Sequence, residues 1–260
     1  MQRLLRHFRT LTRVALLVTL LPLTAHAADY TDLWWTPAEP GWGVNIIQSD
    51  TFMFLTFFIY GADNKPTWYS AQLSPDAQGA YSGGLYLTAG TYYANPWNTA
   101  DSVPAQQVGT AQFRPNATNF HQATLTYVVT GVGTVVKAIE RQALTTIALG
   151  GSYTGGLAGV QLGCNGGAYR RNYDLAVTQA SGVVTLDFTF PTYSCRLMGT
   201  LEQHGSLYTV PSAQYTCSNG FAATATLPEL KATAQGIEGQ WTAPLGGGCS
   251  ENAYFSAVLL

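Results

Sequence analysis

The sequence predicts an all-β protein built from two antiparallel β domains. Only 10% of its 260 residues are charged while 47% are hydrophobic, which is the opposite of the balance found in disordered chains. Glycine and tyrosine are abundant, with 27 and 15 residues, and aromatic and β-branched residues favour strands. No apolar stripe with a helical period continues for three turns. Strands and turns are therefore expected throughout both domains.

About seven strands are expected in the first half, where short turns separate apolar runs. Ser49-Asp50 and Gly131-Val132-Gly133 mark two of these turns. The run Phe52–Tyr60 is almost wholly apolar, which predicts a central strand covered on both faces. The strands are expected to form a sandwich or a barrel. They are Trp42–Gln48, Phe52–Tyr60, Thr67–Leu73, Gly83–Thr88, Gly109–Arg114, Ala123–Thr130 and Thr134–Gln142.

Eight strands are expected in the second half. With their short connections they favour a lipocalin-like up-and-down barrel, in which the last strand pairs with the first. A barrel of this size can hold one small molecule. The strands are Ser152–Gln161, Asn172–Thr178, Gly182–Phe190, Cys195–Gln203, Ser206–Thr216, Ala222–Leu227, Gly236–Trp241 and Ala253–Leu260.

Residues 1–28 are expected to be a secretory signal peptide. Four arginines form a basic start, Val14–Leu23 is apolar, and Ala25-His26-Ala27 fits a cleavage site. An apolar run of about ten residues is too short to span a membrane. The chain is therefore expected to be cleaved and exported, to the periplasm or beyond the cell, and no longer held in a membrane.

A domain boundary is expected near residue 145. Residues 29–145 hold five of the six tryptophans and no cysteine, whereas residues 146–260 hold all four cysteines. The segment Leu144–Gly151 is uncharged and ends in two glycines, as junctions often do.

The four cysteines predict two disulfides, because an exported chain with an even number of cysteines usually pairs them. Three pairings are possible. Cys195–Cys217 is favoured because these residues flank an expected hairpin that turns at His204-Gly205, which leaves Cys164–Cys249. A four-cysteine zinc site is the alternative, but the sequence has no C-x-x-C pair.

Charge is sparse outside the predicted signal peptide. Four of the 12 basic residues lie within it and all 14 acids follow it, so the remaining chain has a net charge near −6. Nucleic acid is excluded as a partner because few cations remain to contact phosphates. Lys137, Glu140 and Arg141 lie together on one strand, where a solvated face is expected. An inward Arg141 that closes a barrel end against an acid is the alternative.

The segment Leu33–Asn45 combines three tryptophans with two prolines and two glycines. The prolines fix two φ angles, and the glycines allow conformations that other residues avoid. A stiff turn is therefore expected to present Trp34, Trp35 and Trp42 beside Glu39.

This segment resembles the motif W-W-x-P-x-E-x-G-W-G-x-N of a family of exported bacterial proteins whose activity is not established. The similarity extends over residues 32–142 and includes Phe57–Tyr60 and Lys65–Tyr69. Pro40 stands where the family commonly has serine, and Asn64-Lys65 replaces its usual glycine-containing turn. The resemblance implies export and no particular activity.

Two interpretations of the aromatic residues are open. Their rings plug one end of a barrel or sandwich, or they form an exposed platform for carbohydrate or a small apolar ligand, since rigid rings bind with little loss of entropy. The segment Gly90–Ala105 has no strand pattern and is expected to face the tryptophan turn across such a site. The candidate ligand-binding residues are Trp34, Trp35, Glu39, Trp42, Trp68, Tyr69, Tyr92, Tyr93 and Trp97.

The sequence offers little for catalysis. Beyond the signal peptide, only His121 and His204 remain, which excludes a histidine-rich metal site; both are expected to be surface or turn residues. No G-x-S-x-G elbow or phosphate-binding loop is present, so no catalytic residue, metal or cofactor is expected. Glu39 with Asp32 or Asp63 is the carboxylate pair to test for glycoside hydrolysis.

These observations favour an exported, non-catalytic binding protein for a glycan or another small molecule. A structural or protein-interaction module is the alternative, because interfaces are also rich in aromatic residues and poor in charge. An outer-membrane β-barrel is the third interpretation. Four cysteines and a terminal leucine in place of an aromatic residue argue against it.

Overall fold

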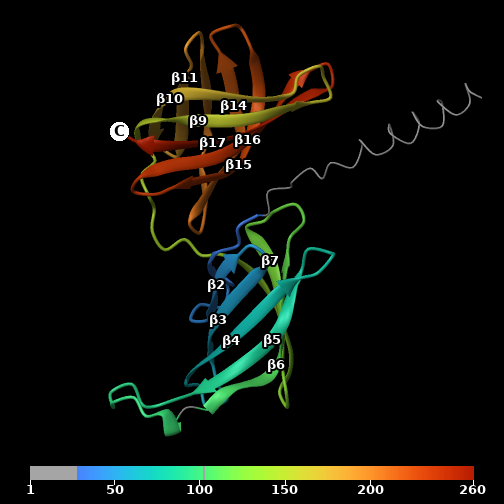
Figure 1. Ribbon diagram of the computed structural model, residues 1–260, viewed down its shortest axis with the longest axis vertical. Coiled ribbons are helices and arrows are strands. Elements are labelled where there is room, and N and C mark those ends of the chain that lie inside the picture. Colours follow the sequence, from blue (N-terminus) through green and yellow to red (C-terminus); the bar gives the residue numbers. More distant parts are fainter. Residues whose placement is uncertain (1–27, 102) are drawn as a thin grey trace, which may run out of the picture.

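The computed structural model describes residues 28–101 and 103–260 of the chain. Figure 1 shows two β-barrels stacked along the long axis of the molecule, the first coloured blue to green and the second yellow to red. The predicted signal peptide lies outside the described residues except for Ala28. Among the described residues, no helix combines the length and the apolar character needed to cross a membrane.

The first barrel is closed by eight antiparallel strands, so the alternative of a sandwich is wrong for this half. Each strand pairs with the next in the sequence, and β8 returns to pair with β1 through Trp34–Arg141 and Trp35–Glu140. A short 3-10 helix, η1 (Thr99–Asp101), lies between β5 and β6. The strands are β1 (Asp32–Trp35), β2 (Gly43–Ser49), β3 (Phe52–Tyr60), β4 (Pro66–Pro75), β5 (Tyr81–Ala89), β6 (Val103–Pro115), β7 (Gln122–Val129) and β8 (Gly133–Arg141).

Two expectations for this half are corrected. The strand β1 was expected to be part of a turn, but it has partners on both sides and completes the ring. The strand β3 is not covered on both faces. Met53, Leu55 and Phe57 are buried, whereas Phe58 is 52% exposed and Tyr60 is 56% exposed. A closed barrel buries only its inner face, so an apolar run alone did not decide the outer one.

The second barrel is an up-and-down ring of eight strands, as predicted. The last strand pairs with the first along Ser250–Leu162 to Leu259–Tyr153, and β12 pairs with β14 to close the ring. The short β13 extends the edge beside the start of β14. The strands are β9 (Gly151–Leu162), β10 (Ala168–Ala180), β11 (Val183–Thr189), β12 (Ser194–Thr200), β13 (Glu202–His204), β14 (Leu207–Cys217), β15 (Ala222–Ala232), β16 (Gly236–Gly246) and β17 (Cys249–Leu259).

Aromatic rings fill both barrels. In the first, Trp34 meets the edge of Phe113 with ring centroids 5.2 Å apart, and both side chains are fully buried. In the second, Phe188 contacts Trp241 and Phe255, each with centroids 5.4 Å apart. Such tilted and edge-to-face contacts are the geometries that aromatic pairs prefer.

Both favoured disulfides are confirmed. Cys195 pairs with Cys217 across β12 and β14, and Cys164 pairs with Cys249 between the β9–β10 and β16–β17 turns. Both bonds lie at the same end of the second barrel. The turn at Gly205, which contacts the first barrel, lies at the opposite end of these strands.

A buried ion pair lies where the barrels meet. The Arg141 guanidinium is 3.2 Å from the Asp32 carboxylate, and both side chains are almost completely buried. Asp32 also accepts hydrogen bonds from the Ser206 backbone N–H (2.9 Å) and hydroxyl (3.0 Å) of the second barrel. The inward Arg141, an alternative left open by the sequence, is therefore confirmed.

The two histidines also meet at this junction. The rings of His121 and His204 stack with centroids 4.3 Å apart. His121 lies in the turn before β7, as expected, but it is 4% exposed, so it is not a surface residue. Neither of its ring nitrogens has a hydrogen-bond partner in the described part of the chain. Burial, followed by the charges of His204 and Arg141, lowers the pKa of His121 to about 3.

Candidate functional site

The tryptophan turn divides between the core and the surface of the first barrel. Trp34 is fully buried, and its indole N–H donates to the Tyr30 carbonyl at 3.0 Å. Trp35 and Trp42 are half-buried. Trp34 therefore has the core position that one interpretation gave it, and its ring is not part of a surface platform.

Glu39 and Trp42 are bound to β8. The Lys137 ammonium donates to the Glu39 carboxylate at 2.5 Å and lies 5.4 Å from the centre of the Trp42 ring. The Trp42 indole N–H donates to the same carboxylate oxygen at 3.0 Å. Hydrogen bonding from Lys137 lowers the pKa of Glu39. Glu39 therefore already has Lys137 as its cationic partner.

The carboxylates proposed for glycoside hydrolysis each have a different partner. Asp32 pairs with Arg141 at the junction of the barrels. Glu39 pairs with Lys137, and the exposed Asp63 lies 3.5 Å from Lys65 in its own turn.

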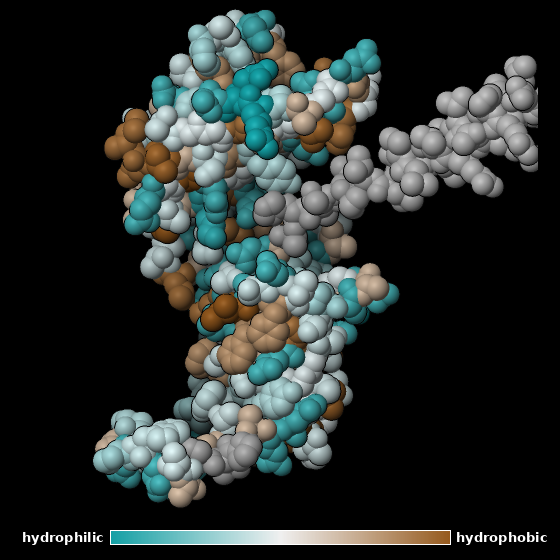
Figure 2. Space-filling view, viewed as in Figure 1, coloured by the Kyte–Doolittle hydropathy of each residue, from teal (hydrophilic) through white to brown (hydrophobic). Residues whose placement is uncertain are grey.

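Trp68 and Tyr69 point to opposite sides of β4, as expected for neighbouring strand residues. Tyr69 packs against the core. Trp68 is 54% exposed and is directly opposite Phe58 in the sheet. Apolar side chains gather on the visible face of the first barrel in Figure 2. The exposed pair belongs to the outer face of β3 and β4.

The remaining aromatic candidates lie on the β5–β6 loop. Tyr92, Tyr93 and Trp97 are 60%, 90% and 70% exposed. Tyr92 and Tyr93 contact each other, with centroids 4.8 Å apart. Within the described residues, no hydrogen bond, ion pair or ring contact joins this loop to the tryptophan turn. The two aromatic segments are therefore not assembled into one site by contacts of their own.

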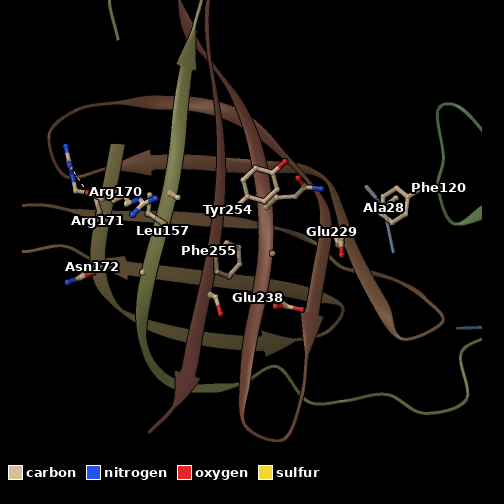
Figure 3. A pocket seen from close by; sticks show the side chains of 15 residues that line it. Ala28, Phe120, Leu157, Arg170, Arg171, Asn172, Glu229, Glu238, Tyr254 and Phe255 are labelled. Carbon is tan, nitrogen blue, oxygen red and sulfur yellow. Dashed lines mark hydrogen bonds between the residues drawn. The ribbon is translucent and has the colours of Figure 1, made fainter. Parts of the chain in front are cut away.

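A groove of about 530 Å³ runs over the outside of the second barrel. Figure 3 shows arginines at one end, Tyr254 in the middle and acids at the other end, with Phe120 and Ala28 of the first barrel beyond them. Gly156 and Ala158 lie between neighbouring longer side chains on this face. The groove is open, and its acid Glu238 has a side chain that is 59% exposed. Solvent screens charges placed in this way.

A different cavity, of about 230 Å³, opens inside the second barrel at its disulfide-bonded end. Glu251 of β17 lies in this cavity and is 6% exposed. Aromatic rings form much of the wall. The residues that line the cavity are Leu157, Gln161, Gly167, Ala168, Tyr169, Arg171, Phe190, Tyr193, Tyr215, Trp241 and Glu251.

Both oxygens of Glu251 accept hydrogen bonds from neutral donors. The Trp241 indole N–H donates to one oxygen at 2.9 Å, and the Tyr169 hydroxyl donates to the other. Each oxygen of this carboxyl group therefore has a hydrogen-bond partner. Within the described residues, no cation lies within ion-pair distance of Glu251.

Tyr169 reaches Glu251 because a glycine separates them. The strand β9 runs between β10 and β17, and Gly159 on β9 is opposite Tyr169 on one side and Ala253 on the other. A Cβ atom at residue 159 would lie 2.3 Å from the Tyr169 ring, so any larger residue would displace the ring.

The phenols around Glu251 are kept neutral. Burial, followed by the hydrogen bond to Glu251, raises the pKa of Tyr169. Burial and the charge of Glu251 also raise the pKa of Tyr215. Both hydroxyls therefore keep their protons and remain hydrogen-bond donors toward the cavity.

Sequence reasoning missed Glu251 and the residues that contact it. One signal was present. In β17 the positions that point inward are Glu251, Ala253, Phe255 and Ala257, so an acid begins an otherwise apolar series. An acid at an inward position of a barrel strand is rarely buried without a partner.

The fold and the cavity define a class of protein, namely a tandem antiparallel β-barrel with a polar cavity in its second barrel. No protein-family model matches the chain, and no curated protein matches it. The resemblance carried by the tryptophan motif stays a prediction.

Several solved structures have a low similarity to this chain. A Bacteroides fragilis chain provisionally described as an outer membrane protein is 13% identical, with 89% of this chain and 97% of that chain covered and a TM-score of 0.34. Isotype 1 transferrin binding protein B of serogroup B Neisseria meningitidis is 10% identical, with 85% and 66% covered and a TM-score of 0.31. A Nostoc punctiforme protein of unknown function from the DUF3598 family is also 10% identical, with 84% and 88% covered and a TM-score of 0.27. Similarity at this level gives no information about ligands.

Proposed function

We propose that the protein is an exported, non-catalytic binding protein that takes a small ligand into the open end of its second barrel. The observation that carries this proposal is Glu251, a buried carboxylate inside an aromatic-walled cavity. A buried polar group in a cavity gives a ligand both orientation and specificity. Export is supported by the two disulfides, which form and persist in oxidising compartments such as the periplasm or the cell exterior.

The proposal is tested by filling the cavity. Gly167 lines it, and a Cβ atom at this residue would meet no atom within 4 Å. The variant Gly167→Phe should therefore fold normally and weaken binding of every cavity ligand by about tenfold or more, because the ring excludes it. Ala158→Phe is the matched control, since it fills the outer groove of the same barrel.

A panel of amines, sugars, carboxylates and short alcohols would be screened against both variants by calorimetry. Binding that Gly167→Phe removes and Ala158→Phe leaves intact would support the cavity. Binding that only Ala158→Phe removes would assign the ligand to the outer groove and refute the proposal.

A second candidate function is carbohydrate binding on the first barrel. It is favoured by the exposed cross-strand pair of Phe58 and Trp68, because sugar rings stack on exposed aromatic faces. Pull-down on insoluble glycans should then be lost in Trp68→Ala and kept in Trp97→Ala, whose ring lies on a separate loop. Capture of a protein partner by the same face would instead favour the protein-interaction module.

A further inference from the structure

We infer that the ligand of the second barrel is a small organic ammonium ion, held by Glu251 and the surrounding aromatic rings. This inference rests on the proposed function and names the ligand class for the same cavity.

The charge of Glu251 is the first step. Its hydrogen-bond donors are the neutral groups of Tyr169 and Trp241, and no cation of the described chain lies within ion-pair distance. A carboxylate removed from water without a counter-charge is costly. A cationic ligand would supply the counter-charge that the barrel lacks.

The one cation in the cavity lining, Arg171, does not form an ion pair with Glu251. Its guanidinium lies 5.5 Å from the centre of the Tyr169 ring and donates to the Arg170 carbonyl at 2.9 Å. The Arg171 residue is exposed, so it lies toward the opening of the cavity and leaves the carboxylate to a ligand.

The aromatic walls of the cavity also favour a cationic ligand. Four further rings accompany Tyr169 around the carboxylate, and two of them, Phe190 and Tyr193, stack with centroids 4.6 Å apart. The faces of aromatic rings carry partial negative charge and attract ammonium groups, most strongly where water is excluded. Rings and a carboxylate together suit a fully methylated ammonium, because such a group has no N–H and needs no hydrogen-bond acceptor in the site.

The size of the cavity is the third step. Its volume of about 230 Å³ equals that of roughly eight water molecules, at ~30 Å³ each. This is less than the ~300 Å³ at which pockets for drug-sized ligands begin. The ligand is therefore small, of the size of choline or tetramethylammonium.

The rim of the cavity is held by the two disulfides. One disulfide joins the two turns beside Gln161 and Glu251, and the other holds β12 against β14 beside Tyr215. Cross-links at the opening keep the rings in position before the ligand arrives, which lowers the entropic cost of binding.

The test compares two probes of nearly the same shape by calorimetry on the oxidised wild-type protein at constant ionic strength. Choline is the cation, and 3,3-dimethylbutan-1-ol is its neutral analogue. Choline should bind at least about tenfold more tightly than the alcohol. In Glu251→Gln this preference should be markedly reduced, because only the rings then favour the cation, whereas Glu238→Gln, which removes an exposed acid from neighbouring β16, should keep it.

The outcomes separate the ligand class from the binding function. Equal binding of both probes to the wild type, or choline binding unchanged in a folded Glu251→Gln, would overturn the ammonium inference. Such a result would leave the cavity as a binding site if Gly167→Phe still blocks both probes.

Absence of choline binding to the wild type would also overturn the inference. Binding of another panel member that Gly167→Phe removes would then preserve the proposed function. If Gly167→Phe weakens the binding of no ligand, both the ammonium inference and the proposed function are refuted. The comparison of probes on the wild type decides the matter even if Glu251→Gln does not fold.

Discussion

The two barrels differ in whether their charged side chains have a partner of opposite charge. In the first barrel each of two cations has an acid beside it: Lys137 pairs with Glu39 and Arg141 pairs with Asp32. In the second barrel Glu251 is buried among neutral donors. A charge with its partner completes a structure, whereas a charge without one leaves an interaction for a ligand to make. On the proposed function, the charges of the first barrel serve stability and the charge of the second serves binding.

Removing a cation from the first barrel should have the largest effect. Arg141→Met leaves the Asp32 carboxylate buried with only the Ser206 donors and the nearby backbone. We expect a loss of about 3–5 kcal/mol in the free energy of unfolding, the usual result of breaking a buried pair. Urea unfolding measures it, with exposed Arg114→Met as the control. A change below about 1 kcal/mol would show that the pair contributes little.

The junction histidine should give the next largest effect. The pKa of folded His121 is about 3, below its ordinary value near 6.5, so the unfolded state binds the proton more readily. Its contribution is constant above pH ~6.5 and falls as the pH decreases toward 3, by at most about 1.4 kcal/mol per pH unit. Half-buried His204, whose pKa is also lowered, should act in the same direction.

Urea unfolding at pH 7 and pH 4.5 measures this effect. His121→Phe keeps a flat ring at the junction and cannot be protonated, so its stability should fall less than that of the wild type over this range. An equal fall in both proteins would exclude His121 as the cause. A protonated His121 would be repelled by the charged Arg141. This repulsion should weaken the junction, so the two barrels should separate more readily at low pH.

A glycine in the second barrel should have an intermediate effect. Gly159→Ala places a methyl group against the Tyr169 ring, and overpacking of this kind costs about 1–3 kcal/mol. The displaced ring would also release its hydrogen bond to Glu251, so ligand binding should weaken. Gly156→Ala is the control on the same strand, because its Cβ would meet its nearest neighbour at an ordinary 3.6 Å. Equal unfolding free energies for the two variants would contradict this packing.

Neutralising Glu251 should change stability the least. The amide in Glu251→Gln can accept from Trp241 and donate to the Tyr169 oxygen, so we expect a change within about 1 kcal/mol in urea unfolding. This small effect, beside the large one for Arg141→Met, would support the comparison of the barrels. A loss above about 3 kcal/mol would assign Glu251 a structural role.

Local patterns were sufficient to predict much of the fold. The bounds of β3 and the turn after His204 followed from apolar runs and turn residues. Both disulfides followed from the expected hairpin. The strand β1 was missed because Trp34-Trp35 precedes a proline-rich turn, and its strand character depends on β2 and β8.

The candidate site depended on contacts that no local pattern contains. Tyr169 and Glu251 are 82 residues apart and meet only because β9 lies between their strands with a glycine at residue 159. His121 and His204 stack because the turn before β7 of the first barrel meets the end of β13 of the second. Composition predicted a ligand platform at the tryptophan motif, but Trp34 lies in the core and Trp42 donates a hydrogen bond to Glu39.

The most direct test of the difference between the barrels is a ¹H–¹⁵N spectrum of the tryptophan indole groups during addition of choline. The Trp241 indole N–H donates to Glu251, whereas that of Trp34 donates to a backbone carbonyl in the first barrel. We expect the Trp241 signal, assigned by its loss in Trp241→Phe, to shift and saturate while the Trp34 signal stays in place. A shift of the Trp34 or Trp68 signals with Trp241 unchanged would contradict binding in the second barrel.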